Sequence, residues 1–443
     1  MAISTSTDRR LVLALTALAL GGFGIGTTEF ATMGVLPLLA DDLGASIPQA
    51  GRAVTAYALG VVVGAPLLAS LTTRLPRKPL LLALIGLFAA GNVVALLAPN
   101  MEVLLGARFL SGLPHGGYLG PAAVVAASLV EPQRRGRAMA RVGMGMTVAN
   151  IVGVPIAAWL GANLGWRAAY GLVVVVAVFT LVALKACLPE HIAYTPAGVR
   201  REFATLKRPA VWLALVAGSI GNMGQFAVYT YVSPIVTDVA GLPPAVLPWV
   251  LALYGVGMTC GAFVAGPLID KSIDRAAFWA LGGLALVLVC LGLFMGHAVV
   301  VLPGLFLLAA GGNLFATSLQ ARLFRDAYDA PSLSAALNHS AFNMSNALGA
   351  FLGGVLISAG LGYRAPALLG VVFICLGVAV LLVARKLSGA SPSRQVLDLD
   401  GSEVVRVRKR DRLRAAGSRI AHTPGRVAHA GSRAVHAAAD RLR

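Results

Sequence analysis

Residues 11–39 read LVLALTALALGGFGIGTTEFATMGVLPLL and contain a single charged side chain, Glu29. A helix needs roughly 20 apolar residues to cross the hydrocarbon core of a bilayer, so this stretch is long enough to span a membrane. A carboxylate at bilayer depth costs several kcal/mol unless it is protonated, paired or facing water. The stretch therefore predicts a membrane helix in which Glu29 carries a proton or holds a cationic group.

The composition extends this prediction to the whole chain. The 443 residues are 58% hydrophobic and 12% charged, with a mean hydropathy of +0.80, whereas soluble domains are about 25% charged. The long apolar runs lack the alternation of transmembrane strands, so they predict helices. We predict an all-α membrane protein with twelve spanning segments, near residues 11–39, 50–72, 79–98, 103–130, 138–160, 167–188, 211–236, 245–269, 277–296, 298–321, 334–359 and 364–384.

Lys and Arg are unevenly divided between the two sides of this predicted bundle. With the N-terminus in the cytoplasm, 19 basic residues lie on the inner side and 3 on the outer side, namely Arg52, Arg167 and Arg364. This asymmetry follows the excess of positive charge in cytoplasmic loops, and it predicts that both termini are cytoplasmic. The net charge of +18 is therefore mostly a consequence of topology and does not predict binding of nucleic acid.

The two halves of the chain are related by an offset of 197 residues. Pro37 corresponds to Pro234, and Arg167 in GWRAAY corresponds to Arg364 in GYRAPA. The offset predicts two parallel six-helix bundles, residues 1–188 and 210–385, joined by a cytoplasmic linker, 189–209. Transporters built from such repeats bind substrate between the halves near the bilayer midplane and rock the halves about that site.

Residues 386–443 differ from the rest, because they contain 13 basic and 5 acidic residues and no long apolar run. This composition favours a disordered cytoplasmic tail. The alternative is a basic amphipathic helix that lies on anionic lipid.

Two charged residues inside the predicted helices break the repeat. Glu29 corresponds to Phe226, and Arg108 corresponds to Leu305. Because structural charges would tend to recur in both halves, we predict a proton-coupling role, with Glu29 as the carrier and Arg108 setting the local field. From the outer helix ends, Glu29 lies about 15 Å deep and Arg108 about 8 Å deep, so the depths are compatible. The alternative is a static ion pair that joins the first helix to the fourth.

Polar side chains within the other predicted helices are candidates for a central substrate cavity. His115 lies seven residues after Arg108, on nearly the same helix face. It either binds substrate or relays a proton, and the alternative is a neutral histidine bonded to a backbone carbonyl. The predicted cavity residues are His115, Asn222, Gln225, Tyr229, Asn313, Asn343 and Asn346. Further polar candidates are Asn150, Gln320, Asn338 and His339, and the candidates for apolar walls are Met33, Phe226 and Phe342.

The loop after the second predicted helix resembles a signature of the major facilitator superfamily. ASLTTRLPRKPLL, residues 69–81, is similar to G-x-L-A-D-R-x-G-R-K at Arg74, Arg77 and Lys78. It departs from that signature at Ala69, Thr73 and Pro76. The corresponding loop in the second half, GPLIDKSIDR, preserves more of the signature, including the positions Asp270, Lys271 and Arg275. The resemblance implies that these residues form a gating motif.

Two further stretches resemble the drug:proton antiporters of this superfamily. LLGARFLSGLPHGG matches L-x-x-x-R-x-x-x-G at Arg108 and Gly112, and GMTVANIVGVPIAAWLG is similar to the antiporter motif of the fifth helix at Gly145, Gly153 and Pro155. GTTEFATMGVLP, residues 26–37, resembles the form in bacterial chloramphenicol, purine-nucleoside and arabinose exporters. The resemblance covers about residues 10–385 and implies a twelve-helix major facilitator fold.

These observations lead to one functional prediction. We expect a proton-coupled exporter of small, partly apolar molecules such as chloramphenicol-like drugs, located in a bacterial plasma membrane and working as a monomer. The alternatives are a nucleoside or sugar exporter of the same fold and, from another class, a non-transporting receptor. The sequence contains no metal-ligand cluster, nucleophile–base pair or phosphate-binding loop, so we expect no enzyme activity, cofactor or ATP dependence. The expected partners are the substrate, protons and lipid.

Overall fold

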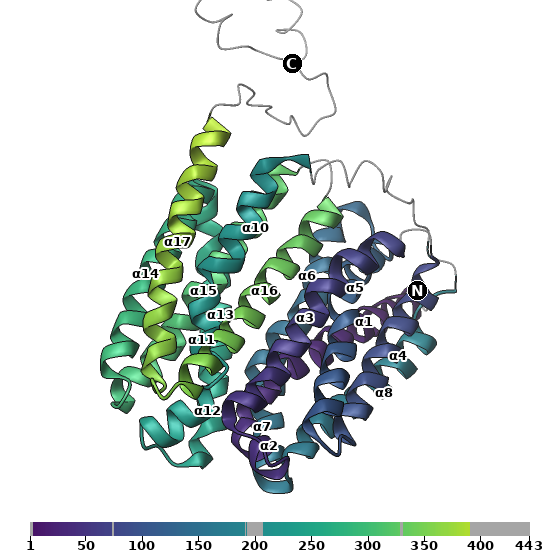
Figure 1. Cartoon of the computed structure of the whole chain (residues 1–443). Helices are drawn as coiled ribbons and strands as arrows, with labels where there is room; N and C mark the ends of the chain where they lie inside the picture. The colour runs from purple at the N-terminus through teal and green to yellow at the C-terminus, as the bar shows by residue number, and fades with distance from the viewer. Residues whose placement is uncertain (1–2, 73–74, 191, 193–206, 328–330, 390–443) are drawn as a thin grey trace, which may run out of the picture. The chain divides into compact units, whose positions relative to one another are not determined.

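The computed structural model describes residues 3–72, 75–190, 192, 207–327 and 331–389, and every regular element among them is a helix (Figure 1). This confirms the predicted all-α class. Contacts divide the chain into one compact unit, Met1–Arg385, and a second, Lys386–Arg443. The predictions for Arg74, for most of the linker and for nearly all of the tail concern residues outside the described part.

The first half of the chain begins with α1 (Ile3–Gly34), which is followed without a loop by the short α2 (Leu36–Asp42). The single segment predicted at 11–39 is therefore two helices. The break lies at Val35, because Pro37 has no N–H to continue the hydrogen bonds of α1. The remaining helices of this half are α3 (Ile47–Leu71), α4 (Arg77–Leu96), α5 (Met101–Ser128), α6 (Arg135–Val148), α7 (Val154–Leu164) and α8 (Trp166–Cys187).

Helix α6 continues into α7 through a π-helical turn, η2 (Ala149–Gly153). Pro155 follows this turn and cannot donate to the carbonyl four residues earlier, which favours such a local widening. In the second half, the segment predicted at 211–236 is likewise interrupted. It comprises α10 (Pro209–Gly221), α11 (Met223–Tyr229), α12 (Val232–Pro234) and a second π-helical turn, η4 (Ile235–Val239).

The rest of the second half consists of long helices. These are α13 (Leu247–Lys271), α14 (Ile273–Phe294), α15 (Ala298–Asp326), α16 (Pro331–Ser358) and α17 (Arg364–Gly389). Their bounds follow the internal repeat, since α5 begins at Met101 and α15 begins 197 residues later at Ala298. The offset seen in the sequence is therefore also an offset in helix boundaries.

Eleven helices among the described residues are long and apolar enough to cross a membrane. The remaining predicted segment, 103–130, is the fourth in chain order and corresponds to α5. This helix is 28 residues long, but it is not among the eleven. Arg108, His115, Pro114 and Pro121 lower its apolar content. Helix α5 nevertheless packs against α3 and α4, so it belongs to the same bundle as the apolar helices.

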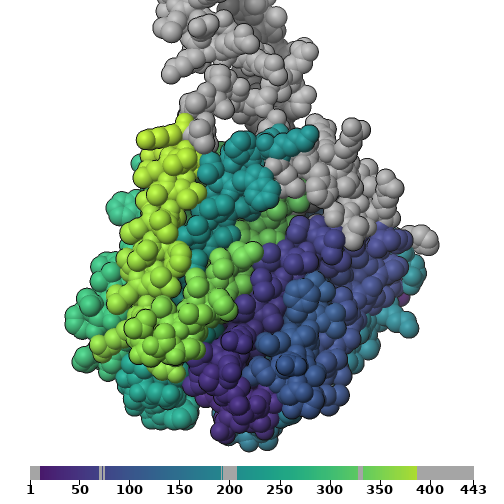
Figure 2. Space-filling view, in the orientation of Figure 1, coloured from purple at the N-terminus to yellow at the C-terminus, as the bar shows by residue number. Residues whose placement is uncertain are grey.

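The helices α3 and α16 form one seam between the two halves (Figures 1 and 2). Thr55 Oγ1 donates to the Ala347 carbonyl at 3.4 Å, and Ser340 Oγ donates to the Val62 carbonyl at 3.3 Å. On the second seam, α13 packs against α7 and η2. A side chain at Gly255 would overlap the backbone of Asn150 there, so glycine permits this close approach.

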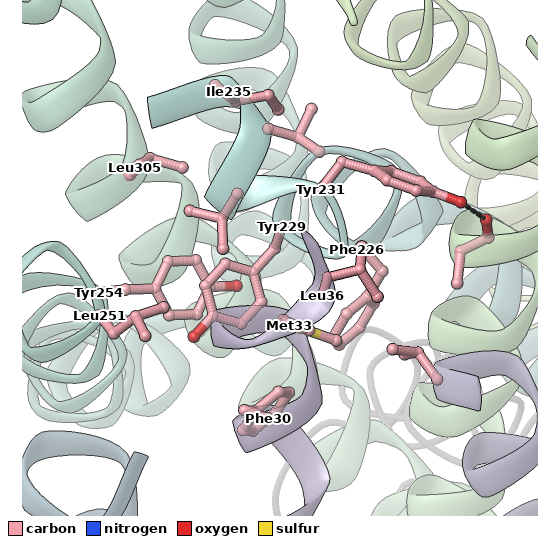
Figure 3. Packing of buried hydrophobic residues seen from close by; sticks show 14 of the residues in the cluster. Phe30, Met33, Leu36, Phe226, Tyr229, Tyr231, Ile235, Leu251, Tyr254 and Leu305 are labelled. Atoms are coloured by element: carbon pink, nitrogen blue, oxygen red, sulfur yellow. Dashed lines mark hydrogen bonds between the residues drawn. The ribbon is translucent and has the colours of Figure 1, made fainter. Parts of the chain in front are cut away.

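The helix ends define two sides of the bundle. We call the linker side the one where α8 ends and α10 begins, and the α2 side the one that carries α2 and η4. On the α2 side, buried apolar residues of both halves form one cluster (Figure 3). Met33 and Leu36 of the first half belong to the same cluster as Tyr231 and Leu251 of the second. Buried apolar side chains of both halves therefore pack together on the α2 side, and the cluster also extends along the helices of the second half.

Candidate functional site

A cavity of about 570 Å³ lies between the two halves. Its walls come from α1, α5, α6 and η2 of the first half and from α13, α15 and α16 of the second. On α15 and α16 it borders the portions nearer the linker side, 313–320 and 338–343. On α13 it borders the middle of the helix, 258–263, and on α1 it borders Glu29 and Phe30, near the α2-side end. The polar side chains of the lining are Glu29, His115, Thr147, Asn150, Thr259, Asn313, Thr317, Gln320, Asn338, His339 and Asn343.

Glu29 lies on α1 at the wall of this cavity, and 2% of the residue is exposed. Asn343 of α16 lies within hydrogen-bonding reach of its carboxyl group, so the acid of one half contacts the other half. Two glycines, Gly145 of α6 and Gly153 of η2, position α1 here. A side chain at Gly145 would overlap the Ala19 carbonyl, and one at Gly153 would overlap the Thr27 hydroxyl. Both glycines therefore allow the fifth spanning segment to pack closely against α1.

Arg108 is completely buried and joins α5 to α1, but it does so through Thr28. Its guanidinium group donates to the Thr28 hydroxyl at 2.9 Å and to the Thr28 carbonyl at 3.0 Å. It also lies 4.2 Å from the centre of the Tyr57 ring, a favourable cation–π geometry. No ion pair between Arg108 and Glu29 occurs in the described structure, where the guanidinium group of Arg108 bonds Thr28, the residue before Glu29. The alternative of a static ion pair is therefore wrong for this conformation.

His115 is fully buried at the cavity wall. Its Nδ1 shares a hydrogen bond with the Tyr57 hydroxyl at 3.1 Å, while its Nε2 has no partner in the structure. The alternative of a histidine bonded to a backbone carbonyl is therefore not what the structure contains. The ring of His339, from α16, lies at a centroid distance of 6.0 Å from that of His115.

Only some of the predicted cavity residues reach the cavity. His115, Asn313 and Asn343 belong to its lining. The other four, Asn222, Gln225, Tyr229 and Asn346, are buried elsewhere in the described structure.

The side chains of Gln225 and Tyr229, both on α11, pack inside the second half and at its boundary. Gln225 donates to the Tyr254 hydroxyl, and the ring of Tyr229 stacks on that of Tyr254. The ring of Phe30, next to Glu29, contacts the ring of Tyr229 edge-on, with 5.7 Å between the ring centroids. It also stacks on the ring of Phe226, at a centroid distance of 6.5 Å (Figure 3). Helix α11 therefore supplies aromatic side chains to the α2 side.

Apolar side chains complete the cavity, and most of them were not predicted from the sequence. Of the three predicted wall residues only Phe342 lines it, whereas Met33 and Phe226 belong to the buried cluster on the α2 side. The sequence offers only a weak signal for the others, because Met and Phe are equally suited to contacts with lipid. The remaining apolar lining residues are Phe30, Met144, Met146, Met258, Ala262, Phe263 and Ala316.

The first copy of the predicted gating motif lies at the start of α4, on the linker side. Lys78 is buried, and its Nζ donates to the Leu188 carbonyl and to the Glu190 carboxylate, each at 2.7 Å. Arg77 is also buried and approaches the Thr72 carbonyl at 3.5 Å. Lys78 therefore ties the start of α4 to the residues that follow α8.

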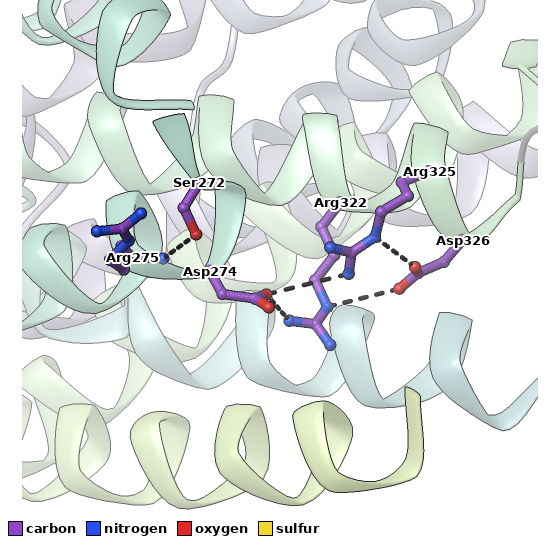
Figure 4. A network of polar contacts seen from close by, with 6 residues as sticks. All are labelled: Ser272, Asp274, Arg275, Arg322, Arg325 and Asp326. Atoms are coloured by element: carbon purple, nitrogen blue, oxygen red, sulfur yellow. Dashed lines mark hydrogen bonds and ion pairs between the residues drawn. The ribbon is translucent and has the colours of Figure 1, made fainter. Parts of the chain in front are cut away.

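The second copy contains a polar network that the sequence did not predict (Figure 4). Asp270, Lys271 and Arg275 are exposed. The acid that forms a partly buried ion pair is Asp274, whose Oδ1 accepts from Arg322 at 2.7 Å. Arg322 also lies 3.5 Å from Asp326, one helical turn away, and Arg325 pairs with both acids. The i,i+4 spacing of Arg322 and Asp326 was the available signal.

One polar contact connects helices on the α2 side. Asp42, at the end of α2, accepts from the Trp166 indole at 2.9 Å and from Arg167 at 2.6 Å. These two hydrogen bonds lower the pKa of the Asp42 carboxyl below its ordinary value. Arg167 also donates to the Ala98 carbonyl at 3.0 Å, so it links the ends of three helices.

Known proteins resemble the chain over most of its length. The family model of the Major Facilitator Superfamily matches residues 18–338. The inner membrane transport protein YdhP of Escherichia coli K12 is 39% identical over 375 residues, which is 84% of this chain and 96% of YdhP. The putative transporter AraJ of the same strain is 35% identical, covering 80% of this chain and 90% of AraJ.

A drug-resistance protein and a solved structure are also similar. The chloramphenicol resistance protein of Streptomyces lividans is 33% identical over 392 residues, which is 87% of this chain and 97% of that protein. The crystal structure of a bacterial homologue of the human lysosomal transporter Spinster, in an inward-facing and unoccupied conformation, superposes with a TM-score of 0.68 at 15% identity. It covers 87% of this chain and 99% of its own, and at this identity the likeness concerns the fold.

Proposed function

The chain belongs to the major facilitator superfamily, and on that premise we propose that it exports small, partly apolar molecules from the cytoplasm in exchange for protons. The relatives include the inner membrane transport protein YdhP and the putative transporter AraJ. The proposal adds the direction of transport, the coupling ion and the substrate class to that family assignment.

The position of Glu29 is the observation that carries the proposal. It is the one acidic side chain in the cavity lining, and the described lining contains no Lys or Arg. A buried acid at the wall of a cavity between two mobile halves is suited to bind a proton from one side and release it to the other. A cavity with this charge favours neutral or cationic substrates and disfavours anions.

The cavity geometry supports alternating access. In this conformation the cavity borders the linker-side portions of α15 and α16, and buried apolar residues of both halves pack together on the α2 side. The excess of Lys and Arg assigns the linker side to the cytoplasm. The protein then loads substrate from the cytoplasm in the conformation described here. Opening the α2 side while the linker side closes would release substrate outward and expose Glu29 to external protons.

The apolar lining and the similarity to a chloramphenicol resistance protein both support chloramphenicol-like substrates. Phe30, Phe263 and Phe342 can contact an aromatic ring, and the amides of α15 and α16 can bond its polar substituents. A nucleoside or sugar exporter remains the alternative, since the same amides suit hydroxyl groups. We propose that the protein works as a monomer in the plasma membrane.

Transport in proteoliposomes tests the proposal. We expect an imposed proton gradient to drive chloramphenicol exchange in the wild-type protein. The variant Glu29→Gln should lose gradient-driven transport while it retains its elution profile and thermal stability. Glu102→Gln, an exposed acid at the start of α5, is the matched control. Undiminished gradient-driven transport in Glu29→Gln would refute the coupling role, and transport of uridine or arabinose alone would favour the alternative substrates.

A further inference from the structure

We infer that His115 and His339 form a substrate-binding pair that spans the two halves and receives the hydrogen-bonding edge of a neutral, partly aromatic molecule. The inference rests on the proposed function and deepens it, because it names the side chains that bind the substrate and the groups that the substrate must carry. It concerns binding in the conformation described here and requires no proton gradient.

The two rings approach each other from opposite halves. His115 belongs to α5 and His339 to α16, and both line the cavity. Their centroids are 6.0 Å apart with the ring planes at 62°. No hydrogen bond joins the two rings in the described structure. A small polar group of a ligand can therefore contact both imidazoles at once.

The free nitrogen of His115 requires a partner. Its Nδ1 is bonded to the Tyr57 hydroxyl, and its Nε2 is buried without one. A phenol donates more readily than it accepts, so Tyr57 donates to Nδ1 and Nε2 carries the hydrogen. Buried polar atoms in folded proteins are nearly always paired. The Nε2–H group therefore calls for an acceptor oxygen from a molecule in the cavity.

Neighbouring amides of the lining require both kinds of partner, donors and acceptors. Asn338 and Asn343 flank His339 on α16, and the Oδ1 atom of each is buried without a hydrogen-bond partner. The Gln320 amide nitrogen, from α15, also has none. A complementary ligand thus carries both donors and acceptors on one edge, as hydroxyl and amide groups do.

The rest of the lining determines the body of the ligand. Phe30 and Phe342 lie beside the polar groups, and Met144, Met146 and Met258 continue the apolar wall. The absence of Lys and Arg from the described lining leaves no counter-ion for a carboxylate or phosphate. These features select a neutral molecule that combines an aromatic or aliphatic body with one hydrogen-bonding edge.

Equilibrium binding of radiolabelled chloramphenicol to the full-length protein in lipid nanodiscs tests the pair. We expect His115→Phe and His339→Phe each to raise the Kd about tenfold, the upper range for losing one hydrogen bond. His115→Gln, which retains a donor, should bind more tightly than His115→Phe. The matched control is His297→Gln, an exposed histidine outside the cavity lining, which should bind like wild type.

A change in the ligand provides a second arm that does not depend on a folded variant. The diacetate ester of chloramphenicol lacks both hydroxyl donors and should bind wild type about tenfold more weakly, for the same reason. Because the ester keeps acceptor oxygens for the Nε2–H group of His115, it should still bind more tightly to wild type than to His115→Phe.

The outcomes separate this inference from the proposed function. If both histidine variants bind chloramphenicol as His297→Gln does, the pair is overturned, while proton exchange through Glu29 still stands. If the wild type binds no chloramphenicol, or binds arabinose or uridine more tightly, the ligand class named here is overturned. If binding follows the predictions but Glu29→Gln transports normally, the binding pair stands and the coupling proposal fails.

Discussion

Arg108 directs its guanidinium group at Thr28, the residue before Glu29, and not at the Glu29 carboxyl group. Consecutive residues of an α-helix point about 100° apart, so Thr28 and Glu29 lie on different faces of α1, and Glu29 lies at the cavity. Thr28 in turn donates to Asn92 of α4 at 2.8 Å, so Arg108 is part of a polar chain across three helices. This arrangement keeps a positive charge near Glu29 without a bond that would have to break in each transport cycle.

A substitution of Arg108 should distinguish the effect of its positive charge from the effect of its hydrogen bonds to Thr28. Arg108→Lys keeps the positive charge but loses the planar guanidinium group, which donates two hydrogen bonds to Thr28 and lies over the Tyr57 ring. We expect roughly a tenfold loss of proton-driven transport, because lysine presents a point charge on a flexible stem. The measurement is the initial rate of exchange in proteoliposomes. Arg141→Lys, an exposed residue of α6, is the control, and an equal rate in both variants would contradict this role.

Thiol labelling should reveal the direction in which the cavity opens. In a background without the four native cysteines, Thr317→Cys lines the cavity and Leu36→Cys lies in the buried cluster. We expect a membrane-impermeant reagent to label Thr317→Cys from the cytoplasmic side and to leave Leu36→Cys unlabelled in the unloaded protein.

The accessibility experiment needs a reference on the other side of the membrane. Leu164→Cys, which is 70% exposed at the α2-side end of α7, should react only from outside. Labelling of Thr317→Cys from outside, with Leu164→Cys reacting from the cytoplasm, would reverse the proposed orientation. Sided vesicles of known polarity distinguish these results.

The network around Arg322 should contribute to stability. Only 3% of the Arg322 side chain is exposed, and Asp274→Asn would remove its nearest counter-charge while Asp326 remains. We expect a loss of about 1–3 kcal/mol in the free energy of unfolding, because a buried guanidinium group loses part of its compensation. A lower thermal unfolding temperature in detergent would be the readout.

Asp270→Asn is a matched control for this change, since Asp270 lies four residues earlier and is exposed. The same substitution there should leave the unfolding temperature close to that of wild type. If both variants unfold at the same temperature, the ion pair with Arg322 has no measurable role in stability.

The contact of Asp42 with Trp166 and Arg167 should depend on pH. Because these hydrogen bonds lower the pKa of Asp42 in the folded protein, its contribution to stability is present above the ordinary pKa of an aspartate. This contribution to stability is lost as the pH falls below about 4 and then through the lowered pKa of Asp42. Trp166 fluorescence in a variant without the other four tryptophans would follow this loss.

Substitution of the two neighbouring acids provides the comparison. Asp42→Asn should remove the acid transition in Trp166 fluorescence, because the amide does not titrate. Asp41→Asn should preserve it, since the bonds to Trp166 and Arg167 come from Asp42. A transition that survives in Asp42→Asn would assign the pH dependence to another group.

The apolar runs, the basic loops and the 197-residue offset were enough to predict a two-fold repeated helical membrane protein. These features are local or periodic, so they can be read along the chain. The same holds for Glu29, because a lone acid in an apolar run is conspicuous without any knowledge of its neighbours. The breaks at Val35, which follows from Pro37, and at Asn222 were not predicted.

Tertiary structure alone decided which polar side chains share a site. Helical spacing groups Asn222, Gln225 and Tyr229 on one face but does not say whether that face meets the cavity or another helix; in the structure it does not reach the cavity. The pairing of His115 with His339 and of Arg322 with Asp274 joins residues far apart in sequence. The periodicity of the sequence determines which side chains share a helix face, whereas the packing of the two halves determines what each face contacts.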